Sequence, residues 1–195
     1  MGYASLRAAA EDLERTGQLV RVKEEVDPNL EMAEVHRRVF DQGGPAILFE
    51  RVKGSPFQAV SNLYGTHQRA EFLFRDTLSA VQKVVALKAD LSQFIKRPFH
   101  FAGTPLTAWR ALPWQTRWFS KVTFGHTDIS QLPQVISWPD DGGAFITLPQ
   151  VFTQPPGDLG IMRSNLGMYC IQLSGNEYKP NEEVGMHYQL HRGIG

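Results

Sequence analysis

Residues 138–147 read WPDDGGAFIT, and this stretch decides how the second half of the chain is interpreted. The DDGG run at 140–143 is a strong turn signal, because glycine readily adopts the backbone angles of tight turns. The apolar residues 144–148 follow at once, which predicts a short strand. The stretch therefore predicts a turn leading into one strand of a β-rich region.

Outward from this turn, the sequence from residue 122 onward has the pattern of a β domain. Turn signals recur at 154–157 (QPPG) and 174–176 (SGN). Between the turns, apolar runs predict further strands at 122–124, 135–138, 166–173 and 184–190. Short strands at this spacing favour a barrel or a sandwich.

The first 95 residues alternate between helix and strand patterns. Ser5 is placed as the N-cap of a first helix and Gly17 as its stop, while Asp27-Pro28 opens a second helix that ends at 43–44. The second helix is expected to bury four apolar residues: Met32, Val35, Val39 and Phe40. Further elements are predicted as strands at 18–22, 46–49 and 57–60 and as helices at 67–75 and 78–87.

Together these patterns predict an α+β chain with two parts. The alternation in the first part is typical of a small α/β domain, which we place at residues 1–110. Residues 96–113, rich in proline, glycine and aromatic residues, are expected to form an ordered connecting segment. The second domain is placed at 111–195.

Composition excludes several classes of protein. The 20 Lys and Arg balance the 20 Asp and Glu, so the chain lacks the basic excess of a nucleic-acid binder. Cys170 is the single cysteine, which excludes an internal disulfide and a cysteine-rich zinc site. Residues 1–21 lack the apolar core of a signal peptide, and no apolar run is long enough to span a membrane. We therefore expect a cytoplasmic protein.

His187 and His191 are the first candidates for a metal site. They are four residues apart, a spacing that puts both rings on one side of a strand or of a helix. Two imidazoles on one face can bind a divalent cation. Tyr188 occupies the position where a zincin motif has its glutamate, so a metal-dependent hydrolase is the weaker interpretation. The structural alternative is a pair of hydrogen-bonded histidines without a ligand.

Asn165 and Gly167 form a second candidate, in the run Ser-Asn-Leu-Gly-Met-Tyr at 164–169. Glycine lets backbone amides approach a phosphate closely, and the side-chain oxygen of asparagine can ligate a hard cation. A plain turn before a strand would give the same pattern. The other histidines, His36 among them, are expected at the surface or in packing roles.

Several blocks along the whole chain resemble the UbiD family of prenylated-FMN-dependent decarboxylases. The similarity is carried by blocks that follow one another in the family's order: 17–22 (GQLVRV), 26–28 (VDP), 43–46 (GGPA), 62–66 (NLYGT), 138–147 (WPDDGGAFIT), 165–169 (NLGMY) and 186–193 (MHYQLHRG). The resemblance implies that the second domain is the beginning of a flavin-binding split β-barrel, incomplete in this chain.

The resemblance also implies a set of site residues. Asn165 would bind a divalent cation such as Mn²⁺, with K⁺ nearby, and His187 would be the second ligand, with His191 as the alternative. The cation would bridge to the phosphate of prenylated FMN. Residues implied to line the cofactor are Gly167, Met168, Tyr169, Cys170 and Gln189. Cys170 departs from the family, which usually has an arginine there to help hold the cofactor.

The activity implied is non-oxidative decarboxylation of aromatic or α,β-unsaturated carboxylic acids. The family's catalytic glutamates and arginine, and its third metal ligand, are expected beyond Gly195, so none is assigned in this chain. We expect an N-terminal fragment that is inactive alone. Implied partners are a carboxylic acid substrate, a flavin prenyltransferase that supplies the cofactor and, for the whole protein, further copies of itself. The alternative is a non-catalytic flavin- and metal-binding module, or a subunit that needs a partner.

Overall fold

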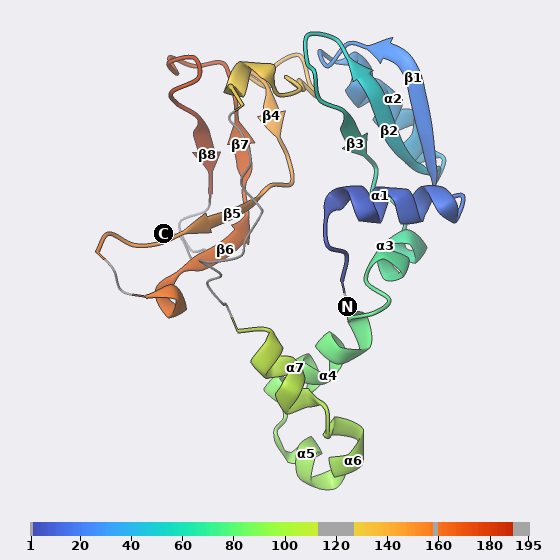
Figure 1. Cartoon of the computed structure of the whole chain (residues 1–195), viewed down its shortest axis with the longest axis vertical. Coiled ribbons are helices and arrows are strands. Elements are labelled where there is room, and N and C mark those ends of the chain that lie inside the picture. Colours follow the sequence, from blue (N-terminus) through green and yellow to red (C-terminus); the bar gives the residue numbers. More distant parts are fainter. Residues whose placement is uncertain (1, 113–126, 158–159, 189–195) are drawn as a thin grey trace.

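The computed structural model describes residues 2–112, 127–157 and 160–188, and it is a mixture of helices and sheets (Figure 1). A three-stranded sheet with its helices forms the N-terminal part. A second group of short strands forms the C-terminal part, and a bundle of short helices projects away from both (Figure 1). This agrees with the expected α+β class. None of the described helices is long and apolar enough to cross a membrane.

The N-terminal sheet has the order β1 (Leu19–Val26), β2 (Ala46–Val52), β3 (Ala59–Ser61). β1 and β2 are parallel and β3 is antiparallel to β2. The crossover from β1 to β2 runs through α2 (Glu31–Asp41), while α1 (Leu6–Arg15) precedes the sheet. The predicted strands at 18–22, 46–49 and 57–60 correspond to these three.

Alternation along β2 explains how one strand serves two cores. Ala46 packs with Leu13 of α1 and Leu73 of α3 (His67–Leu73), whereas Ile47 and Phe49 pack with α2 and β1. Successive side chains of a strand point to opposite faces, so a strand covered on both sides is apolar throughout. Leu13, Ile47 and Phe49 are the largest fully buried side chains, and they mark the centre of this part.

Helix starts differ in how well they were predicted. Ser5 is the N-cap of α1, as expected, and its Oγ accepts a hydrogen bond from Ala8 N at 3.2 Å. Asp27 does not cap α2: its side chain accepts from Asn29 N at 2.9 Å, and the helix begins only at Glu31. The chain reaches the helix through Leu30, in the left-handed region at φ 68°.

Phe40 is a second correction in α2. It was expected to be buried, but half of its surface is exposed, and it stacks on the ring of His36 at 6.2 Å between centroids. Met32 is buried as predicted, and Val35 and Val39 pack against the same core.

Residues 78–112 form a helical arm. Its helices are α4 (Leu78–Ala89), α5 (Ser92–Lys96), α6 (Pro98–Phe101) and α7 (Thr104–Arg110). The segment predicted as an irregular connection at 96–113 is thus mostly helical over its described part. Phe101 is buried inside the arm, while α4 buries none of its residues. In Figure 1 the arm extends beyond both sheets, with α5 and α6 at its tip.

The C-terminal part contains two small antiparallel sheets. One has the order β4 (Phe145–Ile146), β7 (Cys170–Gln172), β8 (Gly185–His187), and the other pairs β5 (Gln150–Thr153) with β6 (Asn165–Met168). Single 3-10 turns lie at Ile129–Gln131 and Ile161–Arg163. The described residues contain no closed barrel.

Several strand predictions need correction here. The run at 166–173 is two strands, interrupted at Tyr169, and β5 was not predicted. Residues 135–138 form no strand; Ile136 instead makes an isolated bridge to Asn29, with Leu30 N donating to Ile136 O at 2.9 Å. This bridge ties the two parts of the chain together. The predicted strand at 122–124 and the end of 184–190 lie outside the described residues.

Candidate functional site

Asn165, Gly167 and Tyr169 form one compact unit. Asn165 and Gly167 are two residues apart in β6, so they face the same side of the strand. The ring of Tyr169, which is buried, folds back over Gly167: a Cβ at position 167 would lie 2.7 Å from the ring. The Tyr169 hydroxyl accepts a hydrogen bond from Asn165 Nδ2 at 2.7 Å. Gly167 is therefore required by close packing.

This hydrogen bond determines what the Asn165 amide can still do. Because its nitrogen donates to Tyr169, its Oδ1 points elsewhere, and no described residue donates a hydrogen bond to that oxygen. The side chain is half-buried. A fixed, unpaired amide oxygen is a ligand that hard cations accept. Asn165 thus fits the metal-binding role that the sequence predicts for it.

His187 and Cys170 lie on neighbouring strands. They are direct partners in the antiparallel register of β7 and β8, so their side chains emerge on the same face. The ring of Phe145 meets His187 edge to face at 5.2 Å between centroids. The Cys170 thiol lies 3.6 Å from Thr147 O, a weak hydrogen bond, and the residue is exposed.

Gln172 organises this face, and sequence reasoning missed it. It is almost fully buried, and its Nε2 donates to Gly142 O at 3.3 Å. Its Oε1 therefore acts as an acceptor, and it lies within hydrogen-bond reach of Asn176, Tyr178 and His187. Since Oε1 accepts, His187 Nε2, 3.0 Å away, carries the proton and Nδ1 keeps its lone pair when the ring is neutral. A polar residue in an apolar strand run was the available signal.

The structure gives the two predicted metal ligands separate partners. Asn165 bonds to Tyr169, and His187 bonds to Gln172. Within the described ranges no group of three or more histidine, cysteine or acidic residues could hold a metal ion. Gln189 and His191 lie outside the described residues, and Met168 is exposed on β6. The choice between His187 and His191 stays open.

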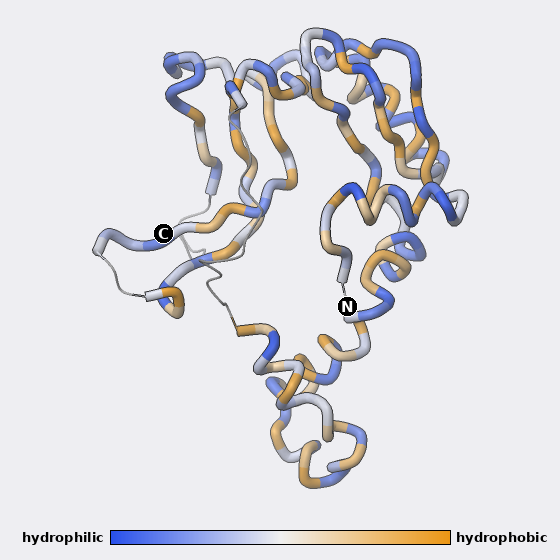
Figure 2. The backbone as a smooth tube through the Cα atoms, viewed as in Figure 1, coloured by the Kyte–Doolittle hydropathy of each residue, from blue (hydrophilic) through white to orange (hydrophobic). Residues whose placement is uncertain are grey.

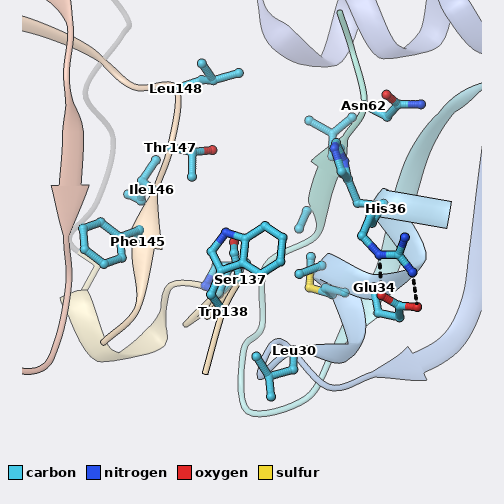
Figure 3. A pocket seen from close by; sticks show the side chains of 18 of the residues that line it. Leu30, Glu34, His36, Asn62, Ser137, Trp138, Phe145, Ile146, Thr147 and Leu148 are labelled. Atoms are coloured by element: carbon cyan, nitrogen blue, oxygen red, sulfur yellow. Dashed lines mark hydrogen bonds and ion pairs between the residues drawn. The ribbon is translucent and has the colours of Figure 1, made fainter. Parts of the chain in front are cut away.

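A cavity of about 860 Å³ lies between the two parts of the chain (Figure 3). Its walls come from α2, from β3 and the turn after it, and from residues 132–148, and they are mainly apolar. Figure 3 shows His36 and Trp138 on the two sides of this space. The volume falls in the range that holds small organic ligands.

His36 is the main polar group in this cavity. Its Nδ1 is hydrogen-bonded to Ser61 Oγ, and burial lowers the pKa of the imidazole, so the ring is neutral at neutral pH. The sequence alone assigned His36 a surface or packing role. The structure places it in the wall of the cavity instead, together with Glu34 and Arg37, which pair with each other at 2.8 Å.

Comparison with known proteins adds the family to this geometry. Two family models match consecutive parts of the chain: the 3-octaprenyl-4-hydroxybenzoate carboxy-lyase N-terminal domain at residues 10–88 and the Rift-related domain of the same carboxy-lyase at 114–195. An uncharacterized protein of Chlamydia trachomatis is 38% identical over 98% of this chain and 32% of its own length. A Chlamydia pneumoniae protein, named as one of the subunits of 4-hydroxybenzoate decarboxylase, is 35% identical over 91% of this chain and 30% of its own. The chain spans about a third of the length of these relatives.

Solved structures agree on the fold. The vanillic acid decarboxylase of Sedimentibacter hydroxybenzoicus in its closed form is similar over the whole chain and 39% of its own, with a TM-score of 0.70 and 23% identity. An evolved dimeric form of the UbiD-class enzyme HmfF from Pelotomaculum thermopropionicum, in complex with prenylated FMN, is similar over 96% of this chain and 39% of its own, with a TM-score of 0.63 and 22% identity. With both domain models matched in order over most of its length, the chain belongs to the UbiD family.

Proposed function

We propose that this chain serves a non-oxidative decarboxylase of aromatic or α,β-unsaturated carboxylic acids that uses prenylated FMN. The observation that carries the proposal is the match of two successive carboxy-lyase domain models. The solved neighbours add support, since one is a vanillic acid decarboxylase and another was determined with prenylated FMN. A carboxylic acid is then the substrate, and a flavin prenyltransferase supplies the cofactor.

In this proposal, the face around β6 and β7 holds the phosphate end of the cofactor through a divalent cation, Mn²⁺, with K⁺ beside it. Asn165 contributes Oδ1 to the cation, because its nitrogen is engaged by Tyr169. A neutral imidazole contributes the second ligand, from His187 or His191. The residues proposed to line the phosphate and ribityl chain are Gly167, Met168, Tyr169, Cys170 and Gln189.

The chemistry divides between cofactor and protein. Prenylated FMN, when bound, supplies the electron sink that decarboxylation requires. The described residues orient and hold: Tyr169 fixes the Asn165 amide, and Gln172 fixes the His187 ring. Cys170 brings a neutral thiol to a position where an arginine would add a positive charge, so anion binding here depends more on the cation. The split barrel implied by the family is the proposed framework of this site.

A second candidate function is a non-catalytic flavin- and metal-binding module, or a subunit that acts with a partner. Two observations favour it over a self-sufficient enzyme. Cys170 replaces the expected arginine, and the relative from Chlamydia pneumoniae is named as one part of a decarboxylase with several subunits. Association of the whole protein with further copies of itself is compatible with both candidates.

The test is cofactor retention. The chain is co-expressed with a flavin prenyltransferase, purified with Mn²⁺ and K⁺, and analysed by absorbance, by mass spectrometry of the released cofactor and by metal content. We expect bound prenylated FMN and manganese in the parent and loss of both in Asn165→Ala. Tyr169→Phe removes the hydrogen bond but leaves the Asn165 oxygen, so it should retain most of the cofactor. Gln150→Ala, on the neighbouring strand with an exposed side chain, is the matched control.

The outcomes separate the candidates. Cofactor and metal without decarboxylation, even with a partner supplied, would favour the non-catalytic module. If both the parent and Cys170→Arg are purified folded but without flavin and manganese, the cofactor proposal is wrong. If Asn165→Ala retains as much manganese as Gln150→Ala, the ligand assignment is wrong while the family membership stands.

A further inference from the structure

The tip of the helical arm exposes unusually large apolar side chains. Leu91, Ile95 and Phe99 follow one another at four-residue spacing, and they are 77%, 83% and 95% exposed. They belong to α5, α6 and the residue before α5, which form the end of the arm farthest from both sheets (Figure 1). Figure 2 shows apolar segments alternating with hydrophilic ones around this tip. Single exposed apolar residues are ordinary, but a cluster of this size marks a contact surface.

The same arm carries most of its charge with one sign. The whole chain is electrically balanced, yet residues 78–112 contain one acidic residue, Asp90, against five cations: Lys83, Lys88, Lys96, Arg97 and Arg110. Within the described part of the chain none of these five forms an ion pair, whereas Arg21, Arg37, Arg38 and Arg75 elsewhere all do. The Asp90 carboxylate is used locally, accepting a hydrogen bond from Ser92 N at 2.9 Å. The arm thus presents uncompensated positive charge beside its apolar tip.

We propose that the tip of this arm docks on the surface of an anionic lipid bilayer. Apolar and aromatic residues flanked by lysine and arginine are the composition of helices that lie in a membrane interface. Ile95 and Phe99 enter the boundary between headgroups and acyl chains, and Lys96 and Arg97 contact lipid phosphates. Unpaired cations favour this occupant over a second protein, because lysine is depleted from the core of protein interfaces.

Vesicle binding tests the proposal directly on the whole chain. Sedimentation with vesicles of phosphatidylcholine and phosphatidylglycerol in equal parts is compared with sedimentation with phosphatidylcholine alone. We expect binding to the anionic vesicles that weakens as salt is added. Each basic residue near an anionic surface contributes about fivefold in affinity, so Lys96→Gln with Arg97→Gln should weaken binding about 30-fold. Ile95→Asn with Phe99→Asn should weaken it about 100-fold.

Control variants separate the arm from general charge and stickiness. Lys23→Gln with Lys179→Gln removes two exposed lysines outside the arm, and Phe152→Asn with Met162→Asn removes two exposed apolar residues of the C-terminal part. Both controls should bind as the parent does. Circular dichroism checks that every variant is folded, and the sites in the tip are exposed enough to tolerate substitution.

Three results would overturn the proposal. The first is the absence of binding to the anionic vesicles. The second is binding that the tip variants leave unchanged. The third is self-association, measured by light scattering, that the tip variants abolish in a chain that ignores vesicles, since the tip would then be a protein interface. None of these results depends on flavin binding or decarboxylation, so they leave the proposed function untouched.

Discussion

Arg69 is a buried cation held by backbone carbonyls alone, and its removal is the sharpest test of how the N-terminal part is stabilised. The residue lies in α3 and is 4% exposed. Its guanidinium donates to Asn62 O at 2.7 and 3.2 Å, to Leu63 O at 3.1 Å and to Gly44 O at 3.0 Å. It forms no ion pair with the described residues. These bonds join α3 to the turn before it and to the loop that leads into β2.

The magnitude follows from what Arg69→Met leaves behind. Gly44 O keeps a donor, because Asn62 Nδ2 lies 3.3 Å away. Asn62 O and Leu63 O lose their main donor. An unsatisfied buried acceptor costs about 1–3 kcal/mol, so the variant should lose about 2–6 kcal/mol of its free energy of unfolding. A domain of this size has a total of about 5–15 kcal/mol, so the loss would be large.

Urea unfolding followed by far-UV circular dichroism measures this loss. Arg38→Met is the matched control, since Arg38 is 72% exposed and pairs with Glu34 at the surface. The control should stay within about 0.5 kcal/mol of the parent. A loss below about 1 kcal/mol for Arg69→Met would refute the reasoning, because the carbonyls would then be finding other donors.

Two further predictions concern a carboxylate and a glycine. Hydrogen bonds from Tyr3 and then from Arg75 lower the pKa of Asp12 to about 2, below its usual value of 3.8. The stabilisation is therefore present above about pH 4 and is lost as the pH falls towards 2, and in acid titrations followed by circular dichroism Asp12→Asn should be less stable than the parent at neutral pH but lose less stability over that interval. Gly167→Ala should displace the ring of Tyr169, because the new Cβ would lie 2.7 Å from it; manganese content below that of Gln150→Ala would be the sign of this, and parental content would contradict it.

The N-terminal part could largely be predicted from the sequence because local signals and tertiary packing agree there. Ser5 caps its helix in the structure as its residue type suggests. The run at 46–49 is a strand with both faces covered, and such strands are apolar throughout. The end of α2 before 43–44 also follows from glycine chemistry, since Gly43 has a φ of 61°.

The remaining features depend on contacts between distant residues. Asp27 has the composition of a helix cap, but its oxygen is used by Asn29 in a turn of its own. Tyr169 reads as one more strand residue, and only its contact with Gly167 and Asn165 interrupts the strand. His36 enters the cavity wall because residues 132–148 fold against α2, which periodicity along α2 does not reveal. Asn165 could be predicted from its motif, whereas Gln172 acquires its role from the turn at Gly142.

The bridge between Asn29 and Ile136 has a mechanical consequence for the cavity. Leu30 N donates to Ile136 O at 2.9 Å and Ile136 N donates to Pro28 O at 3.0 Å, so the start of α2 and the segment before β4 are clamped at one end. Any hinge motion of the two parts must pivot at this clamp or break both bonds, at a net cost of about 0.5–1.5 kcal/mol each. Widening is therefore easiest at the opposite rim, where Leu63 and Leu148 belong to the lining. The clamp makes the cavity a jaw with a fixed joint, and a ligand would pass through the end where these leucines lie.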